Sequence, residues 1–249
     1  MTWWRRWSGP TTRCSAEDIG DYPDGPIAIG LLVGQLAERA STLRHFLVVD
    51  EIESYFADSD ESAATCREIK GRALWPAPAA EGLRSPDAVT FYQADRAARL
   101  LGVDTFAEHW ARVVADPLEA NWSIVMELAT DETIDEIVSF ADRALPLAEI
   151  AAGPADLLGL GPEFQAHRAL GFTMRDLGRF PGRGWPLIDT ALRSPVVNNR
   201  NMALNAIEAW GRPWPAAVRP ALEKAGRDEP TDRVRERVIA LLDQPWQRE

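Results

Sequence analysis

The sequence has little lysine, cysteine or histidine. Of its 27 basic residues only Lys70 and Lys224 are lysine, and the 249 residues include 2 cysteines and 3 histidines. Cys14 and Cys66 lie far apart and neither belongs to a CxxC pair, which excludes a zinc knuckle and a disulfide framework. No two histidines have short helical spacing, which argues against an iron site of two histidines and a carboxylate.

Long apolar runs are also missing. The longest one near the N-terminus covers residues 27–36, whereas a membrane-spanning helix needs about 20 apolar residues. No apolar segment typical of a signal peptide follows the opening MTWWRRW. We therefore expect a cytoplasmic protein with free thiols that does not enter a membrane.

The charge is acidic overall and unevenly distributed. The formal net charge is −11. Residues 1–159 carry 13 basic and 27 acidic side chains, whereas residues 160–249 carry 14 and 11. The stretch 121–159 alone has eight acidic residues and one basic residue. This balance lacks the basic surface of a nucleic-acid-binding protein. The acidic surface of residues 1–159 and the mildly basic surface of residues 160–249 either face solvent, or complement each other or a partner.

Helical periodicity dominates, and the two-residue alternation of exposed strands is almost absent. Apolar residues recur at i, i+3, i+4 and i+7 between Ile29 and Leu47, which indicates an amphipathic helix. The segment WPAPAAEGLRSP, residues 75–86, has three prolines and a glycine and is interpreted as a linker or exposed loop. It separates a helical N-terminal region, 1–86, from a helical domain, 87–249. Further helices are predicted over 50–57, 61–74, 87–101, 104–116 and 118–129.

The last third of the chain repeats itself. Similar segments begin at Gln165, Asn198 and Asp232, and aligning them gives offsets of 34 and 33 residues. The first two copies continue through a Pro/Gly/Trp break into a second helix, over 185–192 and 215–225. Helix pairs at this period are typical of an α-solenoid, in which stacked pairs bury a common core. The predicted fold is therefore all-α, with an α-solenoid in the C-terminal half whose repeats are clearest over residues 160–249.

These repeats resemble HEAT-type repeats, whose second helix tends to read D-x-V-R-x-x-A-x-x-A-L. The matching residues are Asp232, Val234, Arg235, Val238, Leu241 and Leu242, and more loosely Val197, Arg200, Ala203, Ala206 and Ile207. The resemblance implies helix pairs packed for protein interaction rather than for catalysis. In such arrays arginines often form a ladder with acidic groups of a neighbouring repeat. Arg168, Arg200 and Arg235, which are 32 and 35 residues apart, either form that ladder or contact a ligand.

The stretch RNMALNAIEAWGR, residues 200–212, is similar to one in a bacterial family some of whose members are labelled limonene hydroxylase. That label implies an enzyme acting on an apolar substrate. Neither cysteine lies in the glycine-framed loop of a haem-thiolate protein, and residues 159–164 lack the third glycine of a flavin-binding loop. We therefore expect no catalytic residues, metal or cofactor, and an enzyme or small-molecule binder stays as the alternative.

Two polar stripes form the candidate binding surface. On one predicted helix the spacing is i, i+4, i+7 and i+11, and on an earlier one it is i, i+7 and i+11. If both line the inner face of the solenoid, they face one groove of Arg and Asn that suits carboxylates, as in a protein or acidic peptide partner. The alternative is that both stripes simply face solvent. The sequence does not indicate an oligomeric state. The candidate residues are Asn201, Asn205, Glu208 and Arg212 on the first helix, Arg168, Arg175 and Arg179 on the second, and Arg200.

Tryptophan is frequent, with 10 in the chain. Trp75, Trp185 and Trp214 each precede a proline after a helix break, where the ring can cover the end of a core while its N–H bonds a carbonyl. Three more, Trp3, Trp4 and Trp7, belong to a predicted N-terminal arm.

Overall fold

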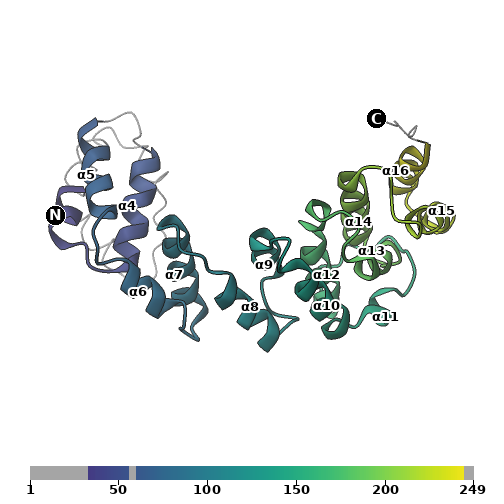
Figure 1. Ribbon diagram of the computed structural model, residues 1–249, viewed down its shortest axis with the longest axis horizontal. Coiled ribbons are helices and arrows are strands. Elements are labelled where there is room, and N and C mark those ends of the chain that lie inside the picture. The colour runs from purple at the N-terminus through teal and green to yellow at the C-terminus, as the bar shows by residue number, and fades with distance from the viewer. Residues whose placement is uncertain (1–32, 56–59, 244–249) are drawn as a thin grey trace. The chain divides into compact units, whose positions relative to one another are not determined.

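The computed structural model describes residues 33–55 and 60–243, which consist of α-helices and their connections (Figure 1). No β-strand occurs in these two ranges, and an isolated bridge joins Leu157 to Val196. The prediction of an all-α fold is therefore confirmed. Among the described helices, none combines the length and apolar character that crossing a bilayer requires. The predicted N-terminal arm lies outside the described residues.

Contacts divide the chain into two compact units, one ending at Thr105 and the other beginning at Phe106. The Pro-rich segment 75–86, at which the sequence predicts a boundary, lies inside the first unit. Each unit buries apolar side chains in clusters of its own. The two units are therefore described separately.

The first unit packs its helices around side chains such as Phe46, Val49 and Ile69, all with no exposed surface. The sequence predicts a break near residue 49, but the helix is continuous there. The interruption comes earlier, because the Thr42 hydroxyl accepts a hydrogen bond from His45 N (3.4 Å) and so begins a new helix. The helices of this unit are residues 33–39, α4 (Leu43–Tyr55), α5 (Asp60–Lys70), α6 (Pro76–Gly82) and α7 (Ala88–Leu100).

The Pro-rich segment forms α6 rather than the predicted linker or exposed loop. Pro76 occupies its first turn, where a missing N–H costs nothing. The preceding Trp75 is fully buried, and its indole N–H donates to Ile69 O at 2.6 Å. A Cβ at Gly82 would lie 2.6 Å from the Ala94 Cβ, so glycine lets α6 approach α7 closely. In this segment proline therefore begins a helix, and glycine allows close packing of two helices.

The second unit contains the repeated segments. Their first helices begin at Gln165, Val197 and Asp232, within one residue of the predicted starts. The second helix of the first repeat covers Trp185–Leu192, as predicted. The helices of this unit (Figure 1) are α8 (Phe106–Ala115), α9 (Trp122–Leu128), α10 (Ile134–Ala144), α11 (Leu147–Ile150), α12 (Gln165–Met174), α13 (Trp185–Leu192), α14 (Val197–Trp210), α15 (Val218–Asp228) and α16 (Asp232–Asp243), with short 3₁₀ turns at Pro162–Phe164 and Leu177–Arg179.

The helix α14 contacts both α12 and α16, which are the corresponding helices of the adjacent repeated segments. On the α12 side, the Trp210 indole N–H donates to Leu177 O at 3.1 Å. A Cβ at Gly178 would lie 2.8 Å from the Ala209 Cβ, so glycine allows this close approach. The intervening helices pack against the helices that follow them, α13 on α14 and α15 on α16. This packing fixes which faces of α12 and α14 stay open.

Replacing Trp75 by alanine tests whether the Pro-rich segment belongs to the core. We expect Trp75→Ala to lower the free energy of unfolding of the first unit by about 3–5 kcal/mol, because it removes a buried ring and leaves Ile69 O without its donor. Urea unfolding followed by circular dichroism measures the change. The control Val89→Ala, at a side chain that is 65% exposed, should change it by less than about 0.5 kcal/mol. Equal effects of the two variants would contradict a buried role for Trp75.

Candidate functional site

The predicted stripe on α14 faces α16, where Arg237 reaches three of its four residues. Arg237 Nη2 donates to Asn205 Oδ1 at 2.6 Å and to Glu208 Oε2 at 2.7 Å. Its Nη1 lies 3.4 Å from both the backbone O and the side-chain Oδ1 of Asn201. The acceptors that this stripe offers are therefore occupied by a cation of the same chain.

The fourth residue of the stripe, Arg212, binds the end of α16. Its Nη2 donates to Leu241 O at 2.6 Å and to Leu242 O at 3.1 Å, two carbonyls that the helix end leaves without intrahelical partners. Its guanidinium also lies over the Trp214 ring, 4.3 Å from the ring centroid. Arg212 therefore stabilises the junction of α14 with α16.

Arg200 is buried in an ion pair with Glu229, and their side chains are 1% and 2% exposed. Arg200 Nε and Nη2 donate to the two carboxylate oxygens, both at 2.7 Å, in a bidentate arrangement. Its Nη1 donates to the backbone carbonyls of Ala155, Ser194 and Pro195 at 2.8, 2.8 and 3.1 Å. An external partner does not reach this guanidinium, so we remove Arg200 from the candidate binding residues. The contacts fit the ladder alternative instead.

Arg168 and Arg235 repeat part of the arrangement around Arg200. Arg168 Nη1 donates to Gly161 O at 2.7 Å. Arg235 donates to Glu229 O through Nε at 3.0 Å and Nη2 at 2.8 Å. Each arginine ties its own helix to the connection that precedes it, as Arg200 does. The near-periodic arginines therefore share a structural role, and Glu229 joins two of them.

The exposed face of α12 carries Arg168, Phe172 and Arg175. The two arginines flank Phe172 at i−4 and i+3, so all three lie on one side of the helix. Phe172 is 46% exposed, so a partner can reach its ring between the two arginines. Arg175 is also exposed, and its side chain forms no hydrogen bond or ion pair with the part of the chain that the structure describes.

Arg179, the third residue of the α12 stripe, is turned toward α9. Its guanidinium donates to the carbonyls of Met126, Glu127 and Ala129 at 3.2, 3.0 and 3.0 Å, which caps the end of that helix. Within residues 33–55 and 60–243, no hydrogen bond or ion pair joins the α12 stripe to the α14 stripe. Arg168, Arg175 and Arg179 are all exposed, but only the Arg175 side chain is without a hydrogen bond or ion pair to the described residues.

An exposed leucine loop precedes α12 and was missed by the sequence analysis. Leu158 is 76% exposed and Leu160 is 81% exposed. The loop is held in place because Val197 N donates to Leu157 O at 3.0 Å, and the bond from Arg168 to Gly161 O ties it to α12. The sequence does indicate that these leucines are exposed, since they lie in the Pro/Gly-rich stretch GPADLLGLGP, outside any predicted helix.

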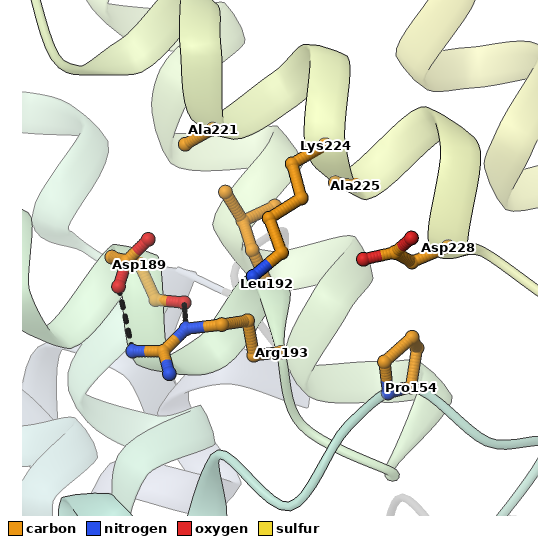
Figure 2. Close-up of a pocket in the computed structure, with 8 residues that line it drawn as sticks. All are labelled: Pro154, Asp189, Leu192, Arg193, Ala221, Lys224, Ala225 and Asp228. Carbon is orange, nitrogen blue, oxygen red and sulfur yellow. Dashed lines mark hydrogen bonds and ion pairs between the residues drawn. The ribbon is translucent and has the colours of Figure 1, made fainter.

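A cleft of about 360 Å³ lies between α13 and α15 (Figure 2). On α13, Arg193 Nη2 donates to Asp189 Oδ2 at 2.6 Å, and Arg193 Nε donates to the Asp189 carbonyl at 3.3 Å. On α15, Lys224 and Asp228 are one helical turn apart, and no hydrogen bond or ion pair joins their side chains (Figure 2). The sequence carries no signal for this cleft, because it depends on how two helices far apart in the chain pack. The lining residues are Pro154, Asp189, Leu192, Arg193, Ala221, Lys224, Ala225 and Asp228.

Burial shifts the pKa values of the partly buried His167 and the fully buried Cys66. Burial lowers the pKa of His167 below its ordinary value of 6.5, and its Nδ1 lies 3.0 Å from Ser194 Oγ. Burial, reinforced by the Glu53 carboxylate, raises the pKa of the Cys66 thiol, which makes this cysteine a poor nucleophile near neutral pH. Across the described ranges, no three side chains of His, Cys, Asp or Glu gather in a way that would hold a metal ion.

Comparison with known proteins finds no relative. No protein-family model matches the chain, and neither the curated proteins nor the solved structures give a match.

The contribution of the buried Arg200–Glu229 ion pair can be tested by measuring stability. We expect Glu229→Gln to lower the free energy of unfolding by about 3–5 kcal/mol, because it leaves the charge of Arg200 buried without a counter-ion. The double variant Arg200→Met with Glu229→Leu should lose less than Glu229→Gln alone. Urea unfolding measures both. The control Glu223→Gln breaks an exposed pair with Arg219 and should cost less than about 1 kcal/mol. A Glu229→Gln effect no larger than this control would contradict the argument.

The lowered pKa of His167 predicts a pH dependence of stability. The unfolded chain binds a proton on this histidine near pH 6.5, whereas the folded chain binds it only at lower pH. The free energy of unfolding should therefore fall as pH decreases below about 6.5, until the folded pKa is passed. Comparing wild type with His167→Gln by urea unfolding between pH 7 and pH 5 isolates this contribution. Parallel pH profiles of the two proteins would contradict it.

Proposed function

We propose that the second unit is an α-solenoid of HEAT-type helix pairs, clearest over residues 160–249. Corresponding helices begin at Gln165, Val197 and Asp232, which preserves the repeat period found in the sequence. The contacts of α14 with both α12 and α16 fit the stacking of successive repeats. The shared role of Arg168, Arg200 and Arg235 at the start of each repeat supports the same arrangement.

The function that we propose for this unit is non-enzymatic binding of a protein or acidic peptide, in the cytoplasm. The observation that carries it is the exposed face of α12, where Arg175 is without a partner in the described chain and Phe172 is 46% exposed. Aromatic side chains and arginines are the residue types enriched at the energetic centres of interfaces. A partner with carboxylates beside an apolar anchor would pair with Arg168 and Arg175 and cover Phe172.

The leucine loop extends this proposed surface. Arg168 ties the loop to α12, so Leu160 adds an exposed apolar side chain near the start of the helix that carries Phe172. The α14 stripe contributes less, because Arg237 already occupies its acceptors. The proposed partner therefore follows α12 rather than the predicted groove between two stripes.

The alternative of an enzyme acting on an apolar substrate gains no support from the α13–α15 cleft. Four of its eight lining residues, Asp189, Arg193, Lys224 and Asp228, are charged. Pockets for apolar ligands are lined mainly by apolar and aromatic side chains.

A charge reversal on α12 tests the proposed function. Labelled peptides that combine Glu and Asp with Leu or Phe anchors are titrated with the full chain, and fluorescence anisotropy gives the dissociation constant. We expect Arg175→Glu and Phe172→Ala each to weaken binding about tenfold or more, because charge-assisted bonds and aromatic anchors carry such energies. Binding should also weaken with added salt.

The matched control is Arg227→Glu, which reverses an exposed arginine of α15. It should leave the dissociation constant within about twofold, since it changes the net charge equally but lies away from α12. Failure of all the peptides to bind, or equal loss in Arg175→Glu and Arg227→Glu, would overturn the proposal.

A further inference from the structure

Lysine is the unusual cation in this chain, since 25 of its 27 basic residues are arginine. One lysine is explained by its contacts: Lys70 Nζ lies 2.5 Å from Asp50 Oδ1 and 3.0 Å from Glu53 Oε2. The side chain of the other, Lys224, forms no ion pair or hydrogen bond with the described residues, although it lines the cleft between α13 and α15. Lys224 is exposed, so a ligand in the cleft can reach its ammonium group.

The cleft presents opposite charges on separate groups. In Figure 2 the Lys224 side chain extends from α15 toward Leu192 at the base of the cleft, and the Asp228 carboxylate also points into it. The Asp228 carboxylate, like the Lys224 ammonium, has no ion pair or hydrogen bond with the part of the chain described. Across the cleft, Arg193 donates to Asp189 through Nε and Nη2, and its other guanidinium N–H groups have no acceptor among the described residues.

We propose that this cleft binds a small zwitterion of the amino-acid or short-peptide type. Its carboxylate would pair with Lys224 and with the remaining donors of Arg193, and its ammonium group would pair with Asp228. The proposal goes beyond the proposed function, because it involves none of the residues of α12.

Size and lining fit this ligand class. The cleft volume of about 360 Å³ lies near the lower end of the range for small-molecule pockets, roughly 300–1,000 Å³. Leu192, Ala221 and Ala225 provide an apolar wall for a short side chain. Lys224 and Asp228 are one turn apart, a spacing of roughly 5–6 Å between Cβ atoms that suits the two ends of such a zwitterion. A purely anionic ligand would leave Asp228 opposing it.

Amide NMR spectra of the full chain, titrated with L-alanine and with L-alanyl-L-alanine, test the proposal. We expect saturable shifts at residues of α13 and α15 for at least one probe, in the millimolar range or tighter. Lys224→Gln and Asp228→Asn should each weaken binding by about tenfold to a hundredfold, as expected for loss of a charged hydrogen-bond partner. Blocking the ammonium of the same probe by N-acetylation should weaken binding to the wild type and change little for Asp228→Asn.

The control Arg227→Gln neutralises the exposed neighbour of Asp228 and should leave the affinity within about twofold. Three results would overturn the proposal: no saturable shifts with either probe, shifts unaffected by both Lys224→Gln and Asp228→Asn, or equal binding of the N-acetylated probe. None of these results bears on the α12 surface, which the peptide titration tests separately.

Discussion

Burying a guanidinium removes hydration worth several kcal/mol, and the second unit compensates this loss at Arg200 by providing an acceptor for every N–H. Glu229 accepts two of the bonds, and the carbonyls of three residues in two preceding connections accept others. These acceptors come from the segment before α12, the segment before α14 and the segment before α16. The Arg200 side chain thus holds three connections together. These connections fix the positions of α12, α14 and α16 relative to one another.

The relative positions of these helices decide which polar side chains remain available to a ligand. Once α14 and α16 are held together, Arg237 lies against Asn201, Asn205 and Glu208 and occupies them. Arg212 is used in the same junction, on the carbonyl end of α16. Among the described residues, no side chain occupies Arg175 in this way, and Phe172 stays 46% exposed. The asymmetry between the two stripes is therefore a consequence of packing, and it is the reason for placing the proposed partner on α12.

Helical periodicity and breaks predicted the helices of the second unit well, because Pro, Gly and Trp at the breaks act locally. The helix Trp185–Leu192 illustrates this, since Pro186 at its first turn and Gly184 before it set its start without help from distant residues. The predicted tryptophan role holds for Trp75, whose N–H reaches a carbonyl, but not for Trp214, whose buried Nε1 has no partner among the described residues.

The candidate site was predicted less well, because exposure depends on residues far along the chain. Asn201 and Asn205 have the spacing of an open polar face, and only the placement of Arg237, more than 30 residues later, occupies it. Phe172 was missed for the opposite reason, since an aromatic residue at helical spacing ordinarily belongs to the core. Periodicity assigns residues to one side of a helix, but it does not say what covers that side.

The uneven charge of the sequence is partly balanced inside the second unit. Arg183 pairs with Asp135 of the acidic α10, and Arg179 caps α9, which begins the acidic stretch. Basic residues of the C-terminal part are therefore used on the acidic part that precedes them. Arg175 lies between Arg168 and Arg179 on the α12 stripe and shares in neither kind of contact. The Arg175 side chain has no bond to the described residues that binding would break, which is why the proposed acidic partner is placed there, beside the exposed Phe172 ring.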